Sequence, residues 1–363
     1  MFSRVRRPLH PNVVLSLVAT AVTLLVTGFT LAVAAPAGQA SAGHPPGPAA
    51  GIQQDTASPP VAYVDVTVAT VWTSPGSPRP LDKPALGNPV NIPRWLASMN
   101  PAQRRWLISH NATQTQALYG QPVDIIGRRG GWDEVAVPGQ PTPKNPLGYP
   151  GWVPKVQLVS APGYGRLLAS RPSVLVSRVR TGWLDRTPAG GRSLPVSFAT
   201  RLPLLARAPG AYEVATPSGG PRWLPAAGAT VSSPGGPAPS GAAIAATAKM
   251  FLGVPYLWAG RSGYAFDCSG FTSELYQAYG LTIPRDAGPQ ARGGGATRVS
   301  RARLRPGDIL FYASGGSIYH DALYIGGGRA IEAGLPDGSM PPVRVSTHIS
   351  GPSYWGAVRY LHS

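Results

Sequence analysis

Cysteine is almost absent from this chain, since Cys268 is the only one in 363 residues. A single cysteine excludes an intrachain disulfide. The sequence also contains no Cys-x-x-Cys pair and no His-Glu-x-x-His run, so the common zinc ligands are missing. The glycines at 326–328 lack the lysine of a phosphate-binding loop and are typical of a turn. We therefore expect neither a metal nor another cofactor.

Acidic residues are scarce as well. The chain has 15 Asp and Glu residues and 32 Lys and Arg residues, which gives a formal net charge of +17. Most of the excess lies between residues 61 and 237. The arginines are scattered along the chain, and we find no nucleic-acid-binding motif. The basic character therefore favours anionic polymers or peptide carboxylates over nucleic acid as partners.

The N-terminus has the pattern of an export signal. Arg4, Arg6 and Arg7 precede an uncharged, mostly apolar run at 13–35, and Ala40-Ser41-Ala42 follows as a small-x-small cleavage pattern. We expect residues 1–42 to be a signal peptide and the protein to be secreted. The apolar run is also long enough to cross a bilayer, so an uncleaved anchor on the outer face of the membrane is the alternative.

Two stretches rich in Pro, Gly, Ala and Ser divide the rest of the chain. They lie at 43–60 and 232–240, and we expect both to be linkers, the first of them disordered. Between them, short apolar runs broken by Gly and Pro are typical of small β-barrels. Three runs resemble successive strands of a bacterial SH3-like barrel, and they lie at 123–126, 132–137 and 149–153.

We expect this first barrel to cover residues 61–160, with one helical insert from Trp95 to Ser109. A weaker echo of the pattern, with strands at 212–215 and 222–225, predicts a second barrel over 161–231.

Cys268 lies where a loop is expected to become a helix. Phe271, Leu275, Ala278 and Tyr279 form one apolar stripe at helical spacing, and Gly280 can end the helix. A thiol at a helix N-terminus is close to the positive end of the helix dipole, which favours the nucleophilic thiolate. A buried cysteine that acts as a small hydrophobic residue is the structural alternative.

A nucleophilic thiol needs a base, and His320, His348 and His362 lie downstream. The segment 320–333 predicts a hairpin folded about residues 326–327, which brings His320 and Glu332 to the same face of the sheet. There the carboxylate can fix the imidazole tautomer, the third role in a catalytic triad. His348 lies in a stretch typical of a loop, and His362 lies next to the C-terminus.

These motifs resemble those of the NlpC-type cell-wall cysteine peptidases. The resemblance runs from about 241 to 363, and its motifs are found, in order, at 253–260, 266–271, 283–290 and 304–311. It implies an α+β, papain-like catalytic domain after the two barrels. It assigns Cys268 as nucleophile, His320 as base and Glu332 to the third position, where the family more often has His, Asn or Gln.

The same resemblance implies that Tyr256, Asp267 and Ser269 bind substrate. The family usually has an apolar residue at position 321, where this chain has Asp321. Strand alternation predicts that Asp321 faces away from Cys268, in a tuning or solvent-exposed role.

The runs 113–120 and 137–152 narrow the resemblance to the YkfC-type γ-D-glutamyl-L-diamino acid endopeptidases. That resemblance implies cleavage of peptidoglycan stem peptides, a preference for a free N-terminal L-Ala, and a place for Tyr149 in the cleft. It also implies association with the cell wall, with peptidoglycan, muropeptides and anionic wall polymers as partners. The diamino acid stays open, and the alternatives are a peptidoglycan amidase or acyltransferase on the same fold, or a non-catalytic wall-binding protein.

Overall fold

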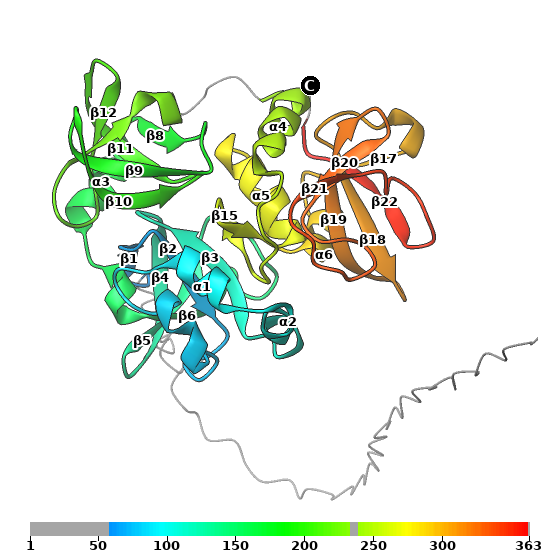
Figure 1. Ribbon diagram of the computed structural model, residues 1–363, viewed down its shortest axis with the longest axis horizontal. Coiled ribbons are helices and arrows are strands. Elements are labelled where there is room, and N and C mark those ends of the chain that lie inside the picture. The colour runs from blue at the N-terminus through cyan, green and yellow to red at the C-terminus, as the bar shows by residue number, and fades with distance from the viewer. Residues whose placement is uncertain (1–57, 233–238, 362–363) are drawn as a thin grey trace, which may run out of the picture. The chain divides into compact units, whose positions relative to one another are not determined.

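The computed structural model describes residues 58–232 and 239–361. The predicted signal peptide at 1–42, most of the first linker, residues 233–238 of the second linker and His362 lie outside them. Residues Ala57–Ser363 form one compact unit that contains three β-sheets of six or seven strands (Figure 1). Within the described ranges, no helix is both long and apolar enough to cross a membrane.

The first sheet has seven antiparallel strands in the order β3-β2-β6-β5-β4-β1-β7. Alternate side chains of these strands, Val71, Val123 and Val135 among them, are fully buried in one core. The three predicted strands are present as β4, β5 and β6. The strands are β1 (Val61–Val64), β2 (Val68–Trp72), β3 (Thr113–Leu118), β4 (Pro122–Arg129), β5 (Trp132–Val137), β6 (Tyr149–Pro154) and β7 (Leu158–Val159).

The insert between β2 and β3 contains two α-helices where the sequence predicted one. Helix α1 (Ile92–Ser98) is followed by its C-cap, Met99, and α2 (Pro101–Ser109) begins after Asn100. The Asn100 side chain accepts a hydrogen bond from the Gln103 backbone, and the Gln103 side chain accepts one from the Asn100 backbone. This reciprocal cap, followed by a proline in the first turn, starts a new helix at Asn100.

The second sheet repeats the strand order of the first, as β10-β9-β13-β12-β11-β8-β14. The predicted strands at 212–215 and 222–225 correspond to β12 and β13. The repeated sequence pattern therefore corresponds to a repeated strand order. Helix α3 (Pro162–Ser170) leads into this sheet. Its strands are β8 (Ser173–Val176), β9 (Thr181–Thr187), β10 (Gly190–Ser197), β11 (Arg201–Ala208), β12 (Ala211–Val214), β13 (Arg222–Pro225) and β14 (Ala229–Ser232).

The third sheet is antiparallel, in the order β17-β22-β18-β19-β20-β21. Its strands are β17 (Thr297–Val299), β18 (Ile309–Ser314), β19 (Ser317–Gly326), β20 (Arg329–Glu332), β21 (Arg344–Ser346) and β22 (Tyr354–Arg359). Helices α4 (Gly241–Ala248), α5 (Cys268–Ala278) and α6 (Ala287–Arg292) belong to this region, as does the small hairpin of β15 (Arg261–Ser262) and β16 (Ala265–Phe266). Short 3-10 turns occupy Pro80–Ala85, Lys155–Gln157, Ala226–Gly228, Lys249–Phe251 and Arg301–Arg303.

Helix α5 has the length and the apolar stripe that the sequence predicted. The Asp267 side chain caps its first turn by accepting from the Gly270 backbone at 2.6 Å. Phe271 and Leu275 are fully buried, and Gly280 follows the helix with a φ of 79°. The helix packs against β19 (Figure 1), which brings its first residue, Cys268, close to the strand that carries His320.

Hydrogen bonds join the third sheet's region to both earlier sheets. Thr113 of β3 donates to the Trp258 carbonyl at 3.2 Å, and the Arg285 backbone donates to the Pro141 carbonyl at 3.0 Å. On the other side, the Gly263 backbone donates to Ser197 of β10 at 2.9 Å. Residues of the first sheet and of the loop that follows β5 therefore reach the neighbourhood of Cys268.

Candidate active site

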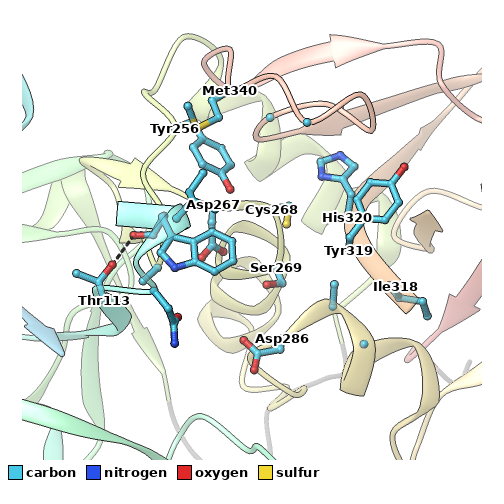
Figure 2. Close-up of a pocket in the computed structure, with 18 of the residues that line it drawn as sticks. Thr113, Tyr256, Asp267, Cys268, Ser269, Asp286, Ile318, Tyr319, His320 and Met340 are labelled. Atoms are coloured by element: carbon cyan, nitrogen blue, oxygen red, sulfur yellow. Dashed lines mark hydrogen bonds between the residues drawn. The ribbon is translucent and has the colours of Figure 1, made fainter. Parts of the chain in front are cut away.

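Cys268 lines a cleft of about 580 Å³ and is only 7% exposed. Figure 2 shows its sulfur and the His320 ring in this cleft, with Tyr256 beside them. The walls come from α5, α6 and β19, and also from the first sheet through Thr113, Gln114 and Tyr149. A substrate in the cleft would therefore contact parts of the chain that are more than a hundred residues apart.

His320 is held from behind by Glu332, as the hairpin register predicted. The two side chains are buried, and His320 Nε2 lies 2.7 Å from Glu332 Oε2. Strands β19 and β20 pair with Leu323 opposite Ile331, which puts both side chains on the same face. The Tyr312 ring packs against the imidazole, with 5.4 Å between the ring centroids. A buried carboxylate at this distance can fix the ring orientation and stabilise an imidazolium.

This contact also decides which ring nitrogen is available to the thiol. Because an ionised Glu332 can only accept, Nε2 carries the hydrogen in this contact, and Nδ1 is then the nitrogen whose lone pair can accept a proton. The second oxygen of the same carboxylate contacts His348, whose Nδ1 lies 3.3 Å from Glu332 Oε1. The sequence pattern placed His348 in a loop. The carboxylate thus bridges two histidines. Only the fold shows this role for His348, since its sequence context is that of an ordinary loop.

The Cys268 thiol is more strongly protonated than its place at a helix N-terminus suggested. Burial raises its pKa well above the ordinary value, and the carboxylates of Asp321 and Asp267 raise it further. The backbone N–H of Ser269 acts in the opposite direction, as expected of a helix start, but it is the smaller effect. The helix start therefore acts in the direction that the sequence predicted, but burial raises the pKa of the thiol by more.

Asp321 is fully buried, so the predicted solvent-exposed position is wrong, and the tuning role is the alternative that is left. Its side chain points to α5 and accepts a hydrogen bond from Thr272 Oγ1 at 2.6 Å. Strand alternation does separate it from His320, but α5 covers that face and has Cys268 in its first turn. Burial raises the pKa of Asp321 from 3.8 to about 6, against the opposing effects of Thr272 and His320.

Asp267 lines the cleft, but its carboxylate is paired with Arg285. Both of its oxygens accept from Arg285, at 2.7 and 3.0 Å, and Oδ1 also caps α5. Arg285 is 1% exposed, and its Nε donates to Thr115 of the first sheet at 2.9 Å. Ser269 accepts from the same guanidinium at 3.2 Å. Sequence reasoning placed Arg285 in a motif without a role, and the structure makes it the residue that organises Asp267 and Ser269.

Tyr256 and Tyr149 both line the cleft. Burial raises the pKa of both phenols well above the usual value, so each stays a neutral donor. The Tyr149 hydroxyl donates to the Asp286 carboxylate at 2.9 Å, and the Lys144 ammonium lies 3.8 Å from the same carboxylate. Asp286 was missed as a site residue, although it directly follows Arg285 in the third motif.

Comparison with known proteins shows the family of this chain. A model of the NlpC/P60 family matches residues 253–359, and a model of the YKFC SH3b2 domain matches residues 179–231. The chain is 42% identical over 308 residues to a γ-D-glutamyl-L-lysine dipeptidyl-peptidase of Bacillus cereus, which covers 83% of this chain and 91% of that protein. The chain belongs to the NlpC/P60 family. It is therefore a cysteine peptidase, and Cys268 is the one cysteine that it contains.

Two further NlpC/P60 relatives extend the likeness beyond the catalytic region. A γ-D-glutamyl-L-lysine dipeptidyl-peptidase of Bacillus subtilis is 39% identical over 269 residues, with 73% of this chain and 87% of that protein covered. The crystal structure of an NlpC/P60 family protein from Bacillus cereus superposes with a TM-score of 0.78 at 41% identity, over 83% of this chain and all of that one. The second sheet, β8 to β14, lies largely within the SH3b2 match.

Proposed function

We propose that this chain is a secreted endopeptidase that cleaves the γ-D-glutamyl to L-diamino acid bond of peptidoglycan stem peptides. The observation that carries the proposal is the cleft that both Cys268 and His320 line, with His320 hydrogen-bonded to Glu332. Two relatives that match most of this chain have names that state the same bond with lysine as the diamino acid. We therefore assign Cys268 as nucleophile, His320 as base and Glu332 as the residue that orients the base.

Acylation begins when His320 Nδ1 takes the Cys268 proton and the thiolate attacks the γ-carbonyl carbon of D-Glu. The charge that develops on the carbonyl oxygen needs donors at the helix start, and the Cys268 backbone N–H and the neutral Tyr256 hydroxyl are candidates there. The tetrahedral intermediate collapses when the imidazolium gives its proton to the departing amine of the diamino acid. This leaves a thioester between Cys268 and the γ-carboxyl group of D-Glu.

Deacylation uses the same base. His320 takes a proton from water, the resulting hydroxide attacks the thioester carbon, and the Cys268 thiolate leaves and regains the proton. L-Ala-γ-D-Glu and the shortened peptide are the products. Glu332 keeps Nε2 as the donor throughout, so that Nδ1 is always the nitrogen that accepts the proton.

We further propose that the cleft favours peptides with a free N-terminal L-Ala. Asp267 is paired with Arg285, which also donates to Ser269, so we propose that Asp267 and Ser269 hold the substrate backbone rather than an ammonium group. Asp286, which accepts from Tyr149 and is partly exposed in the cleft, is the carboxylate that a substrate ammonium can approach. Thr113, Gln114 and Tyr149 of the first sheet line the same cleft, and we propose that they restrict it to peptides without a glycan.

The location and domain organisation belong to the same proposal. The first sheet has the strand order of the second, which supports two tandem SH3-like barrels ahead of a papain-like domain. The basic excess lies in these two regions and suits anionic wall polymers. We propose that residues 1–42 direct export and that the barrels hold the enzyme at the wall.

The test is product analysis by mass spectrometry. Protein spanning residues 57–363 is mixed with L-Ala-γ-D-Glu-diaminopimelate, with its lysine counterpart, and with the N-acetylated form of each. We expect release of L-Ala-γ-D-Glu from the free-amine peptides, and loss of that release in Cys268→Ala and in His320→Ala. His110→Ala changes an exposed histidine at the C-cap of α2 that does not line the cleft, so it is the matched control and is expected to keep full activity.

The outcomes separate the alternatives. Full activity in Cys268→Ala or His320→Ala would refute the mechanism. Cleavage of acetylated and free peptides at equal rates would keep the peptidase and remove the amine preference. Release of a different fragment by the wild type would indicate an amidase or acyltransferase, and binding to cell walls without any product would indicate a wall-binding protein.

A further inference from the structure

Three acceptor groups from separate elements surround one ammonium group in the cleft. The Nζ of Lys144 donates to Gln114 Oε1 at 2.9 Å and to the Tyr149 hydroxyl, and it lies 3.8 Å from Asp286 Oδ2. All four residues line the same cleft as Cys268, and Figure 2 shows the Asp286 carboxylate there. The cleft therefore contains a site for an ammonium group, and a side chain of the protein itself fills it.

Hydrogen bonds to the surrounding protein orient these acceptors. Gln114 lies on β3, and its amide nitrogen donates to Thr73 Oγ1 at 2.7 Å, which turns its oxygen toward the ammonium. The Tyr149 hydroxyl donates to the Asp286 carboxylate at 2.9 Å, so its lone pairs are left for an ammonium donor. An ammonium group has three donors and no acceptor, and it meets here an amide oxygen, a phenol oxygen and a carboxylate.

The Lys144 side chain is able to leave this site. It reaches the acceptors from the loop between β5 and β6 and is 44% exposed. A lysine side chain has a flexible four-carbon stem, so the ammonium can move into water while the loop stays in place. Burial lowers the pKa of Lys144, against the opposing effect of Asp286. Partial desolvation of this ammonium therefore has a cost that its return to water would remove.

We propose that Lys144 occupies the ammonium site in the free enzyme and that the N-terminal ammonium of the peptide displaces it. Both are ammonium groups with three donors, so the peptide can bind the same acceptors. Two cations at one carboxylate would repel each other, and among the described residues Lys144 is the one cation that forms an ion pair with Asp286. The inference rests on the proposed preference for a free N-terminal L-Ala.

This exchange would make Lys144 a specificity residue. An acetylated N-terminus is uncharged and has one N–H donor in place of three, so it cannot replace the lysine ammonium at these acceptors. A peptide with a free amine supplies an equivalent group, and the displaced lysine regains its hydration in exchange. Removal of the Lys144 ammonium should therefore favour free-amine peptides over acetylated ones.

The experiment measures binding of L-Ala-γ-D-Glu-diaminopimelate and of its N-acetylated form by calorimetry. The whole chain carries Cys268→Ala, so that no peptide is cleaved. Lys144→Met keeps the apolar stem of the side chain but removes the ammonium. Because both peptides have the same carboxylates, the ratio of their two Kd values reports on the amine alone. We expect the preference for the free-amine peptide to rise about 2- to 5-fold in Lys144→Met, as the loss of a competing, partly exposed ion pair implies.

Two further observations separate displacement from a general effect of charge. Lys155→Met removes an exposed lysine that does not line the cleft, and it should leave the preference unchanged. A crystal structure of the Cys268→Ala protein with the free-amine peptide needs no variant at Lys144. It should place the peptide nitrogen at Gln114, Tyr149 and Asp286, with the lysine ammonium turned into water.

A lower preference for the free-amine peptide in Lys144→Met would overturn the inference, because Lys144 would then belong to the bound state. An unchanged preference would overturn it too, since Lys144 would then be only an ion pair at the edge of the cleft. Equal binding of both peptides by the parent protein would refute the proposed amine preference as well. A raised preference in a protein whose Cys268 form cleaves no peptide would support the inference while refuting the proposed peptidase.

Discussion

The hydrogen bond between His320 and Glu332 offers a direct test of the mechanism through Glu332→Gln. Both side chains are buried, and the atoms Nε2 and Oε2 are 2.7 Å apart. Glutamine has nearly the same size, so the change removes the charge with little effect on packing. It also introduces an amide N–H₂ group that, if turned to Nε2, would force the ring into the tautomer with hydrogen on Nδ1, which cannot accept the thiol proton.

The magnitude follows from the kind of bond that is lost. A hydrogen bond to a charged group contributes about 1.5–3 kcal/mol. If that stabilisation acts on the imidazolium in the transition state, kcat/KM should fall by about 10- to 150-fold. KM should change little, because Glu332 lies behind His320 and does not line the cleft. Cys268→Ala should lose far more activity, since it removes the nucleophile itself.

The assay is steady-state release of L-Ala-γ-D-Glu at pH 7, together with a thermal melt to show that the variant is folded. Glu213→Gln makes the same chemical change on β12 of the second sheet and should match the wild type. A folded Glu332→Gln enzyme with kcat/KM within twofold of the wild type would refute the role of Glu332 as the third catalytic residue.

Three other predictions follow from the structure. Arg285→Met leaves the buried Asp267 carboxylate unpaired and should lower the free energy of unfolding by about 3–5 kcal/mol in urea denaturation, whereas a loss below about 1 kcal/mol would contradict the pairing. Burial raises the pKa of Asp321 from 3.8 to about 6, so the native state holds a proton that the unfolded chain releases between about pH 4 and 6. Stability contributed by that proton is lost as the pH rises through this window, by about 3 kcal/mol, and Asp321→Asn should abolish this loss and melt at a higher temperature at pH 7. His348→Ala removes a half-exposed contact to Glu332 and should lower kcat/KM by only about 2- to 10-fold, and a loss as large as that of Glu332→Gln would contradict this peripheral role.

Local patterns were sufficient to predict the elements that carry the chemistry. The apolar stripe from Phe271 and the stop at Gly280 predicted α5, because helical periodicity and capping act within a few residues. The hairpin folded about residues 326–327 predicted that His320 and Glu332 share a face, because side chains alternate along strands. The division of the helical insert at Asn100 was missed, although Asn100 and Gln103 carry a local signal for it.

The sequence by itself therefore determined the family and the hairpin that places His320 and Glu332 on one face, and it predicted Cys268 as nucleophile and His320 as base. Only the tertiary structure decided what surrounds them. Arg285 meets Asp267 and Thr115, and Tyr149 meets Asp286, across separations of up to 170 residues, and no periodicity reports such pairings. Asp321 is buried because α5 covers its face of β19, and packing between elements, not strand alternation, sets the dielectric around a charge.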